Sequence, residues 1–108
     1  MIQNSMPKTI TANENQIRML IVATDLTKIS GLTVGNLPTV KSLSKKLHGL
    51  VQPSVVYYDE QAKEHTVEFE DDEWMLLTNF WKGFEMGLVP RGGAMLDVIE
   101  SVDKMMKE

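Results

Sequence analysis

The sequence of 108 residues contains no cysteine and only two histidines. The absence of cysteine excludes disulfides, thiolate nucleophiles and zinc or iron–sulfur sites with cysteine ligands. The chain also lacks an H-E-x-x-H pair, a Gly-x-Ser-x-Gly turn and a glycine-rich phosphate-binding loop, which carry metal, nucleophilic and phosphate chemistry. These absences predict a non-enzymatic protein that uses no cofactor and no metal ion.

The sequence also has no long apolar run. A stretch of about 18 apolar residues, the length that spans a bilayer, is missing. Residues 1–8 lack the basic and then apolar pattern of a signal peptide. We therefore expect no membrane partner. Small domains of oxidising compartments often depend on disulfides, so the absence of cysteine favours the cytoplasm.

Acidic residues are absent from residues 26–58, which carry four lysines, whereas residues 59–73 carry eight acidic residues and one lysine. General nucleic-acid binding is disfavoured, because contact with phosphates requires clustered cations. One candidate patch remains, formed by Lys41, Lys45 and Lys46 on one flank of a predicted helix. A nucleic-acid-associated accessory factor that uses this patch is the alternative hypothesis, and a solvated helix face is the simpler interpretation of the same lysines.

Apolar spacing and end signals predict four helices, at about residues 12–29, 37–48, 71–87 and 94–107. Thr11 and Glu14 have the spacing of a capping box at the start of the first helix. The continuous apolar run at residues 19–23 leaves a buried strand as the alternative for that part of the chain. Residues 55–58 and 66–69 are rich in β-branched and aromatic side chains, which predicts a β-hairpin.

The order helix, helix, strand, strand, helix, helix contains no alternating strand and helix units. It predicts an α+β fold in which a helical bundle packs on a small antiparallel sheet. Residues 1–10 are expected to be a mobile tail or an edge strand, and residues 11–108 one compact domain. An isolated hairpin is marginal in water, so a helix must cover it, or a strand from residues 1–10 or a second subunit must extend it.

Methionine is abundant, with eight residues in the chain, and five of them lie in the last two predicted helices. Met75, Phe80 and Met86 fall outside the main apolar stripe of the third helix. We expect them to form, with Met95, an adaptable surface that binds a protein partner or a second copy as a homodimer. Burial in the core is the competing interpretation. The predicted acidic rim of this surface consists of Glu68, Glu70, Asp71, Asp72 and Glu73.

A lysine-bearing second helix at residues 40–47, a hairpin, and the run at 67–74 leading into a helix give a recognisable layout. This layout resembles that of small bacteriophage-encoded proteins of unassigned function, over residues 14–86. The resemblance implies a non-enzymatic accessory role in a phage or bacterium, such as binding a host or virion protein.

A small enzyme is the third hypothesis, with a pocket assembled from His48, Tyr57, Tyr58 and His65. Solvated surface histidines are the simpler interpretation. Gly83 lies inside the predicted third helix, where glycine is unfavourable, which indicates that another helix approaches closely. The segment at 88–92 resembles a thrombin recognition sequence and leaves open whether the last helix is foreign to the fold.

Overall fold

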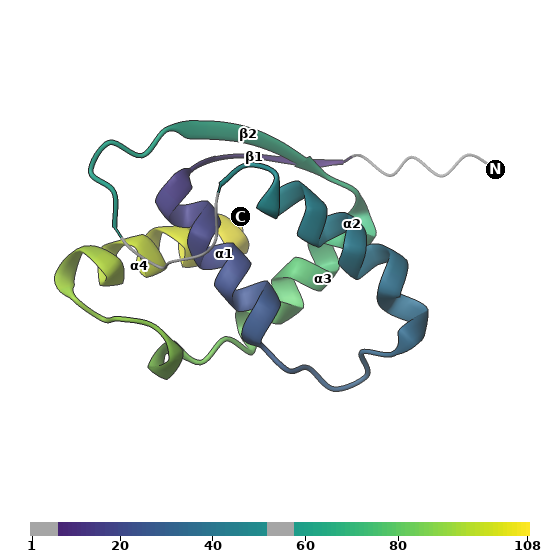
Figure 1. Ribbon diagram of the computed structural model, residues 1–108. Coiled ribbons are helices and arrows are strands. Elements are labelled where there is room, and N and C mark those ends of the chain that lie inside the picture. The colour runs from purple at the N-terminus through teal and green to yellow at the C-terminus, as the bar shows by residue number, and fades with distance from the viewer. Residues whose placement is uncertain (1–6, 52–57) are drawn as a thin grey trace.

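The computed structural model describes residues 7–51 and 58–108 and has the predicted α+β architecture (Figure 1). In this part of the chain, four helices pack with a two-stranded antiparallel sheet. The main elements are β1 (Lys8–Asn13), α1 (Glu14–Leu26), α2 (Leu37–His48), β2 (Glu64–Phe69), α3 (Asp71–Lys82) and α4 (Gly93–Lys107). Two 3-10 turns, η1 (Val34–Asn36) and η2 (Met86–Leu88), lie before α2 and α4.

The sheet joins two strands that are far apart in the sequence. β1 and β2 run antiparallel, with Lys8 opposite Phe69. The sequence predicted that residues 55–58 pair with β2 in a hairpin. Among the described residues, the strand that pairs with β2 is β1. Most of that predicted strand falls within residues 52–57, which lie outside the described part of the chain. Residues 8–10 belong to β1, so the edge-strand interpretation of residues 1–10 is confirmed for these three residues.

Alternating burial explains the register of the sheet. Ile10 and Ala12 are buried in β1, and Val67 and Phe69 are buried in β2, with exposed residues between them. Ile10 lies opposite Val67, so the buried side chains of both strands share one face. In Figure 1 this sheet crosses the top of the molecule and the helices lie beneath it. A slip of one residue would turn the apolar face to solvent.

The central element is α1, which contacts β1 and the other three helices. The apolar run at residues 19–23 is buried throughout, and it is helical, so the predicted helix is confirmed. A helix that is apolar on all sides needs partners on all sides, and its neighbours supply them. Among the described residues, no helix has both the length and the apolar character that a membrane crossing requires.

The start of α1 differs from the prediction. Thr11 belongs to β1, where its Oγ1 lies 3.3 Å from that of Thr66 across the sheet. The capping box is formed instead by Asn13 and Gln16. The backbone N–H of Asn13 donates to the side-chain oxygen of Gln16 at 2.8 Å, and the backbone N–H of Gln16 donates to the side-chain oxygen of Asn13 at 2.9 Å. The helix therefore begins at Glu14, after the strand has ended.

α3 ends at Lys82, earlier than the expected end at residue 87. The close approach predicted at Gly83 is present, but the neighbour is the connection between α1 and α2 rather than another helix. A Cβ atom on Gly83 would lie 3.1 Å from Cγ2 of Thr27 and 3.6 Å from Cγ2 of Ile29. The absence of a side chain lets the connection pack against the end of α3.

The variant Gly83→Ala should lower the free energy of unfolding by about 1 kcal/mol, because Thr27 and Ile29 must shift to admit a methyl group. Urea denaturation of the purified protein measures this loss. Gly87→Ala is the matched control, since nothing lies within 4 Å of a Cβ atom at Gly87. Equal stability of the two variants would contradict the packing argument.

The last helix, α4, belongs to the core. Val98, Val102 and Met106 are buried along one face, and the helix packs against α1. Gln16 of α1 donates from Nε2 to Ser101 Oγ of α4 at 3.0 Å. α4 is thus an integral part of this fold, despite the thrombin-like sequence that precedes it.

Candidate functional site

The four apolar residues expected to form one exposed surface have different environments. Met75 and Met86 are exposed, at 66% and 41% of their surface, whereas Phe80 and Met95 are buried, at 2% and 7%. The expectation that Phe80 and Met95 are surface residues is therefore wrong. α3 packs against both α1 and α2 and buries a wider stripe than a single partner would require, and Phe80 lies within that stripe.

Met75 and Met86 do not share a surface. Met75 lines a hollow between η1, α2 and α3, together with Asn36, Thr39 and Asp72. Met86 lies in η2, past the end of α3, and lines a different hollow. The predicted continuous methionine surface is therefore divided into two separate sites.

The predicted acidic rim divides as well. Glu68, Glu70, Asp71 and Asp72 are exposed, but Glu73 is only 2% exposed. The side chain of Glu73 accepts hydrogen bonds from Lys46 Nζ at 2.6 Å, from Ser42 Oγ and from the backbone N–H of Glu70. Glu73 thus closes the capping box of α3 and ties this helix to α2.

The charge of Glu73 is stabilised by these partners. Burial by itself raises the pKa of this carboxyl group. Hydrogen bonds from Lys46, Ser42 and the Glu70 backbone, together with the positive charge of Lys46, outweigh burial and hold the pKa below its ordinary value of 4.5. Glu73 is therefore an ionised structural residue at neutral pH, and it is withdrawn from any surface that meets a partner.

The same contact reduces the predicted basic patch. Lys46 donates to the carbonyl of Glu68 at 2.9 Å as well as to Glu73. Lys41 and Lys45 remain exposed and line a hollow of about 600 Å³ with Leu37, Pro38, Ser42 and Lys46. A patch of two free lysines on this helix face is a weaker binding site for phosphates than the three that the sequence indicated.

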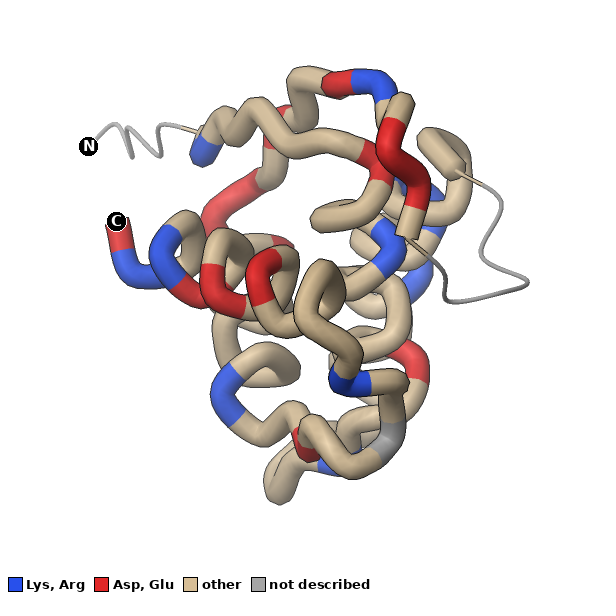
Figure 2. The backbone as a smooth tube through the Cα atoms, turned by 90° about the vertical axis from the view of Figure 1, so that its left-hand side faces the viewer, with Lys and Arg blue, Asp and Glu red and all other residues tan. Residues whose placement is uncertain are grey.

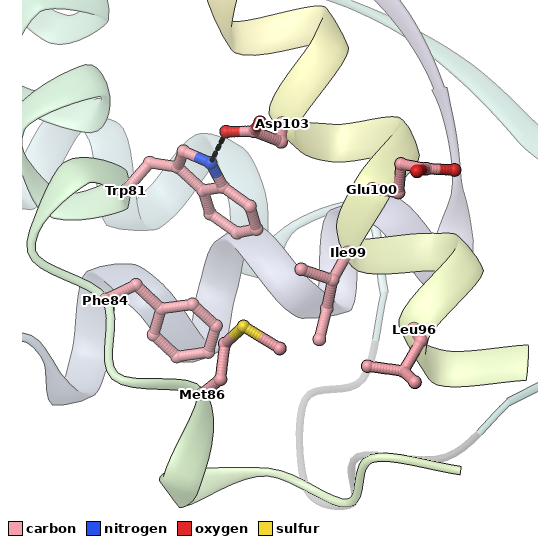
Figure 3. A pocket seen from close by; sticks show the side chains of 7 residues that line it. All are labelled: Trp81, Phe84, Met86, Leu96, Ile99, Glu100 and Asp103. Atoms are coloured by element: carbon pink, nitrogen blue, oxygen red, sulfur yellow. Dashed lines mark hydrogen bonds between the residues drawn. The ribbon is translucent and has the colours of Figure 1, made fainter. Parts of the chain in front are cut away.

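A groove lies where the end of α3, η2 and α4 meet, and we call it the α3–α4 groove (Figure 3). Its cavity volume is about 490 Å³, within the range of ligand and side-chain binding pockets. Trp81 and Phe84 form one side and Leu96 and Ile99 the other, with Met86 between them at the near end. The residues that line it are Trp81, Phe84, Met86, Leu96, Ile99, Glu100 and Asp103.

The apolar wall of the groove is ordered by aromatic and polar contacts. The rings of Trp81 and Phe84 stack with their centroids 5.4 Å apart. Trp81 Nε1 donates to Asp103 Oδ1 at 3.1 Å, and Lys107 Nζ lies 2.8 Å from the other carboxylate oxygen. Met86 and Leu96 leave 41% and 43% of their surfaces exposed. The groove therefore presents apolar side chains on a fixed support.

The rim of the groove is acidic. Figure 2 shows a row of acidic positions along α4, the helix that ends at the C-terminus. Hydrogen bonds from Lys107 and Trp81, with the charge of Lys107, hold the pKa of Asp103 below its ordinary value despite an opposing effect of burial. Glu100 is exposed and makes no ion pair with the rest of the described chain. Glu100 therefore favours a positively charged occupant, whereas the charge of Asp103 is already offset by Lys107.

Sequence analysis found Met86 but missed the residues that α4 contributes to the groove. A signal was present, because Leu96, Ile99, Glu100 and Asp103 recur at steps of three, one and three residues and so share one helix face. This second face was hidden by the stronger apolar stripe that packs on α1. The sequence did predict that the third and fourth helices share one surface, but it assigned Met95, which is buried, as the contribution of α4.

The two histidines of the catalytic hypothesis lie at opposite ends of α1. His65 Nε2 lies 2.9 Å from Glu14 at the start of α1, and His48 Nε2 lies 3.3 Å from Asp25 near the end of the same helix. The hollows described above are lined by neither histidine. Tyr58 is exposed, and Tyr57 lies outside the described residues.

Within residues 7–51 and 58–108, no group of three or more His, Cys, Asp or Glu side chains is placed to hold a metal ion. Comparison of the chain with protein-family models, curated protein sequences and solved structures finds no match.

Proposed function

We propose that this protein is a non-enzymatic interaction module, and that its α3–α4 groove binds an apolar segment of a partner protein that also carries basic side chains. The observation that carries the proposal is the 490 Å³ groove itself, which combines exposed apolar side chains with an acidic rim. Concave apolar surfaces with a few placed charges are typical of binding sites. An accessory role in a phage or bacterium is part of this proposal.

The affinity would come mainly from Met86 and Leu96. Complete burial of a side chain of this size contributes about 1.5–3 kcal/mol, and these two residues are each more than one-third exposed in the free protein. Methionine also adapts to differently shaped partners at low energetic cost. The stacked rings of Trp81 and Phe84 supply a rigid wall against which the partner segment packs.

The selectivity would come mainly from Glu100, because Asp103 is already paired with Lys107. Charges at the rim of a binding site contribute more to partner choice and association rate than to total affinity. An acidic segment would be repelled by the carboxylates of the rim, whereas a basic segment would form ion pairs with them. This charge preference distinguishes the proposal from nonspecific apolar adhesion.

Binding of a labelled, tryptophan-free helical peptide of leucine and lysine tests the proposal by fluorescence anisotropy. A peptide with glutamate in place of every lysine is the charge control. We expect saturable binding of the lysine peptide and at least about tenfold weaker binding of the glutamate peptide. The variants Met86→Ser and Leu96→Ser should each weaken the lysine peptide about tenfold through lost apolar burial.

Met75→Ser is the matched control, because Met75 is equally a surface methionine but lies outside the groove. It should leave the peptide affinity unchanged. Equal effects at Met75 and Met86, or indifference to the charge of the peptide, would refute the proposal. If the protein instead binds single-stranded DNA and loses that binding in Lys45→Glu, the nucleic-acid alternative takes its place.

A further inference from the structure

Apolar exposure is concentrated at a second place, the connection from α1 into α2. Leu26, Leu32, Val34 and Leu37 expose 54%, 38%, 84% and 51% of their surfaces. No acidic residue occurs from position 26 to position 58 of the sequence. The segment formed by this connection and α2 is therefore apolar and basic, whereas the α3–α4 groove is apolar and acidic.

The outer face of α2 combines an apolar side chain with basic side chains in a single row along the helix. Leu37, Lys41 and Lys45 are spaced four residues apart, so they lie on the same face of the helix, and all three are exposed. We call these three residues the α2 stripe. An α-helix rises 1.5 Å per residue, so the two lysines lie about 6 and 12 Å along the axis from Leu37.

The groove edge on α4 carries complementary groups at nearly the same spacing. Glu100 and Asp103 lie about 6 and 10.5 Å along the helix axis from Leu96, and all three residues line the groove. An amphipathic helix that docks in a groove is a common mode of protein recognition. When α2 of one molecule lies parallel to α4 of another, an apolar pair and two oppositely charged pairs come together. These pairs are Leu37 with Leu96, Lys41 with Glu100 and Lys45 with Asp103. The pair of Lys41 with Glu100 supplies most of the attraction, because Asp103 already lies 2.8 Å from Lys107 of its own helix.

We infer that a second copy of this chain occupies the α3–α4 groove through its α2 stripe. The inference rests on the proposed function, because it names the occupant of the same groove. α2 and α4 lie on opposite sides of the molecule (Figure 1), so the stripe and the groove of one chain meet different neighbours. The assembly is therefore head-to-tail and extends to a ring or an open chain, whereas the sequence suggested a homodimer.

Sedimentation velocity over a concentration series tests this inference. The wild-type protein should show an average mass that rises with concentration at low salt and falls back when salt screens the charges. Lys41→Glu and Glu100→Lys should each weaken this association at least about tenfold, because each places like charges together. Both positions are exposed and make no ion pair within the described chain, so the fold should be preserved.

Exchange of the two charges gives the decisive comparison. An equimolar mixture of Lys41→Glu and Glu100→Lys should associate again, and so should the double variant, because each restores opposite charges across the contact. Lys63→Glu, an exposed lysine in the turn before β2, is the matched control and should associate like the wild type. A mixture that stays monomeric would overturn the inference.

The outcome for self-association is separable from that for the groove. A wild-type protein that remains monomeric at all concentrations, yet binds the lysine peptide in a manner sensitive to Leu96→Ser, overturns the second copy as occupant and leaves the proposed function standing. Loss of peptide binding together with monomeric behaviour overturns both. Association that is unaffected by Lys41→Glu and Glu100→Lys also overturns the inference, because it places the contact elsewhere.

Discussion

The variant Phe69→Ala is expected to lose about 4 kcal/mol of the free energy of unfolding. Phe69 is completely buried at the end of β2. The centroid of its ring lies 5.7 Å from that of Trp74 and 5.9 Å from Lys46 Nζ. Replacement by alanine leaves a cavity where the sheet, α2 and α3 meet. Urea denaturation followed by far-ultraviolet circular dichroism measures the loss.

The comparison with Phe69→Leu separates the cavity from a general intolerance of substitution. Leucine retains most of the apolar volume, so this variant should lose less than about 1.5 kcal/mol. Domains of this size have about 5–15 kcal/mol of stability in total, so the alanine variant should lose between about a quarter and most of it. Equal losses in the two variants would show that the ring does not fill the space as we describe.

The variant Glu73→Gln is expected to lose about 2 kcal/mol at pH 7, because it removes a charge-assisted hydrogen bond and leaves Lys46 without its counter-ion. Lys46 retains 33% exposure of its side chain, so water solvates part of its charge and the loss stays below that of a fully buried pair. The amide oxygen of glutamine can still accept from the backbone N–H of Glu70, while its NH2 group replaces the oxygen that accepts from Ser42. Thermal and urea unfolding of both proteins measure the difference.

The dependence on pH identifies the charge as the cause. The pKa of Glu73 is lower in the folded protein than its ordinary value of 4.5, so the folded state binds fewer protons than the unfolded state. The stabilisation is complete above the unfolded-state pKa and disappears as the pH falls through the lower folded-state pKa. The difference between wild type and Glu73→Gln should therefore be constant near neutrality and shrink in acid. Glu68→Gln, at an exposed side chain, should show no such change.

Local signals made the helices predictable. The limits of α2 match the expectation because they depend on nearby residues: Pro38 lies in its first turn and Gly49 ends it. The burial of residues 19–23 also followed from composition, although the sequence left the choice between helix and strand open. In contrast, α3 ends where Gly83 contacts Thr27, a residue distant in the sequence, and no nearby residue signals that contact.

Pairings between distant residues were not predictable from one sequence. Lys46 and Glu73 were assigned to two alternative binding surfaces, but they form one ion pair in the structure. The sequence does not indicate this contact, because each side chain taken alone has the features of a solvated charge. The burial of Phe80 has a related cause, since the number of helices that pack on α3 decides how wide its buried face is.

The pairing of β1 with β2 also has a consequence for synthesis of the protein. All of residues 14–63 must be made after β1 before its partner strand begins to emerge. At about 5–20 residues per second, this interval lasts several seconds on the ribosome. During that time the nascent strand exposes Ile10 and the unpaired N–H and C=O groups of its backbone. The pairing of β1 with β2 must wait until translation has passed Phe69.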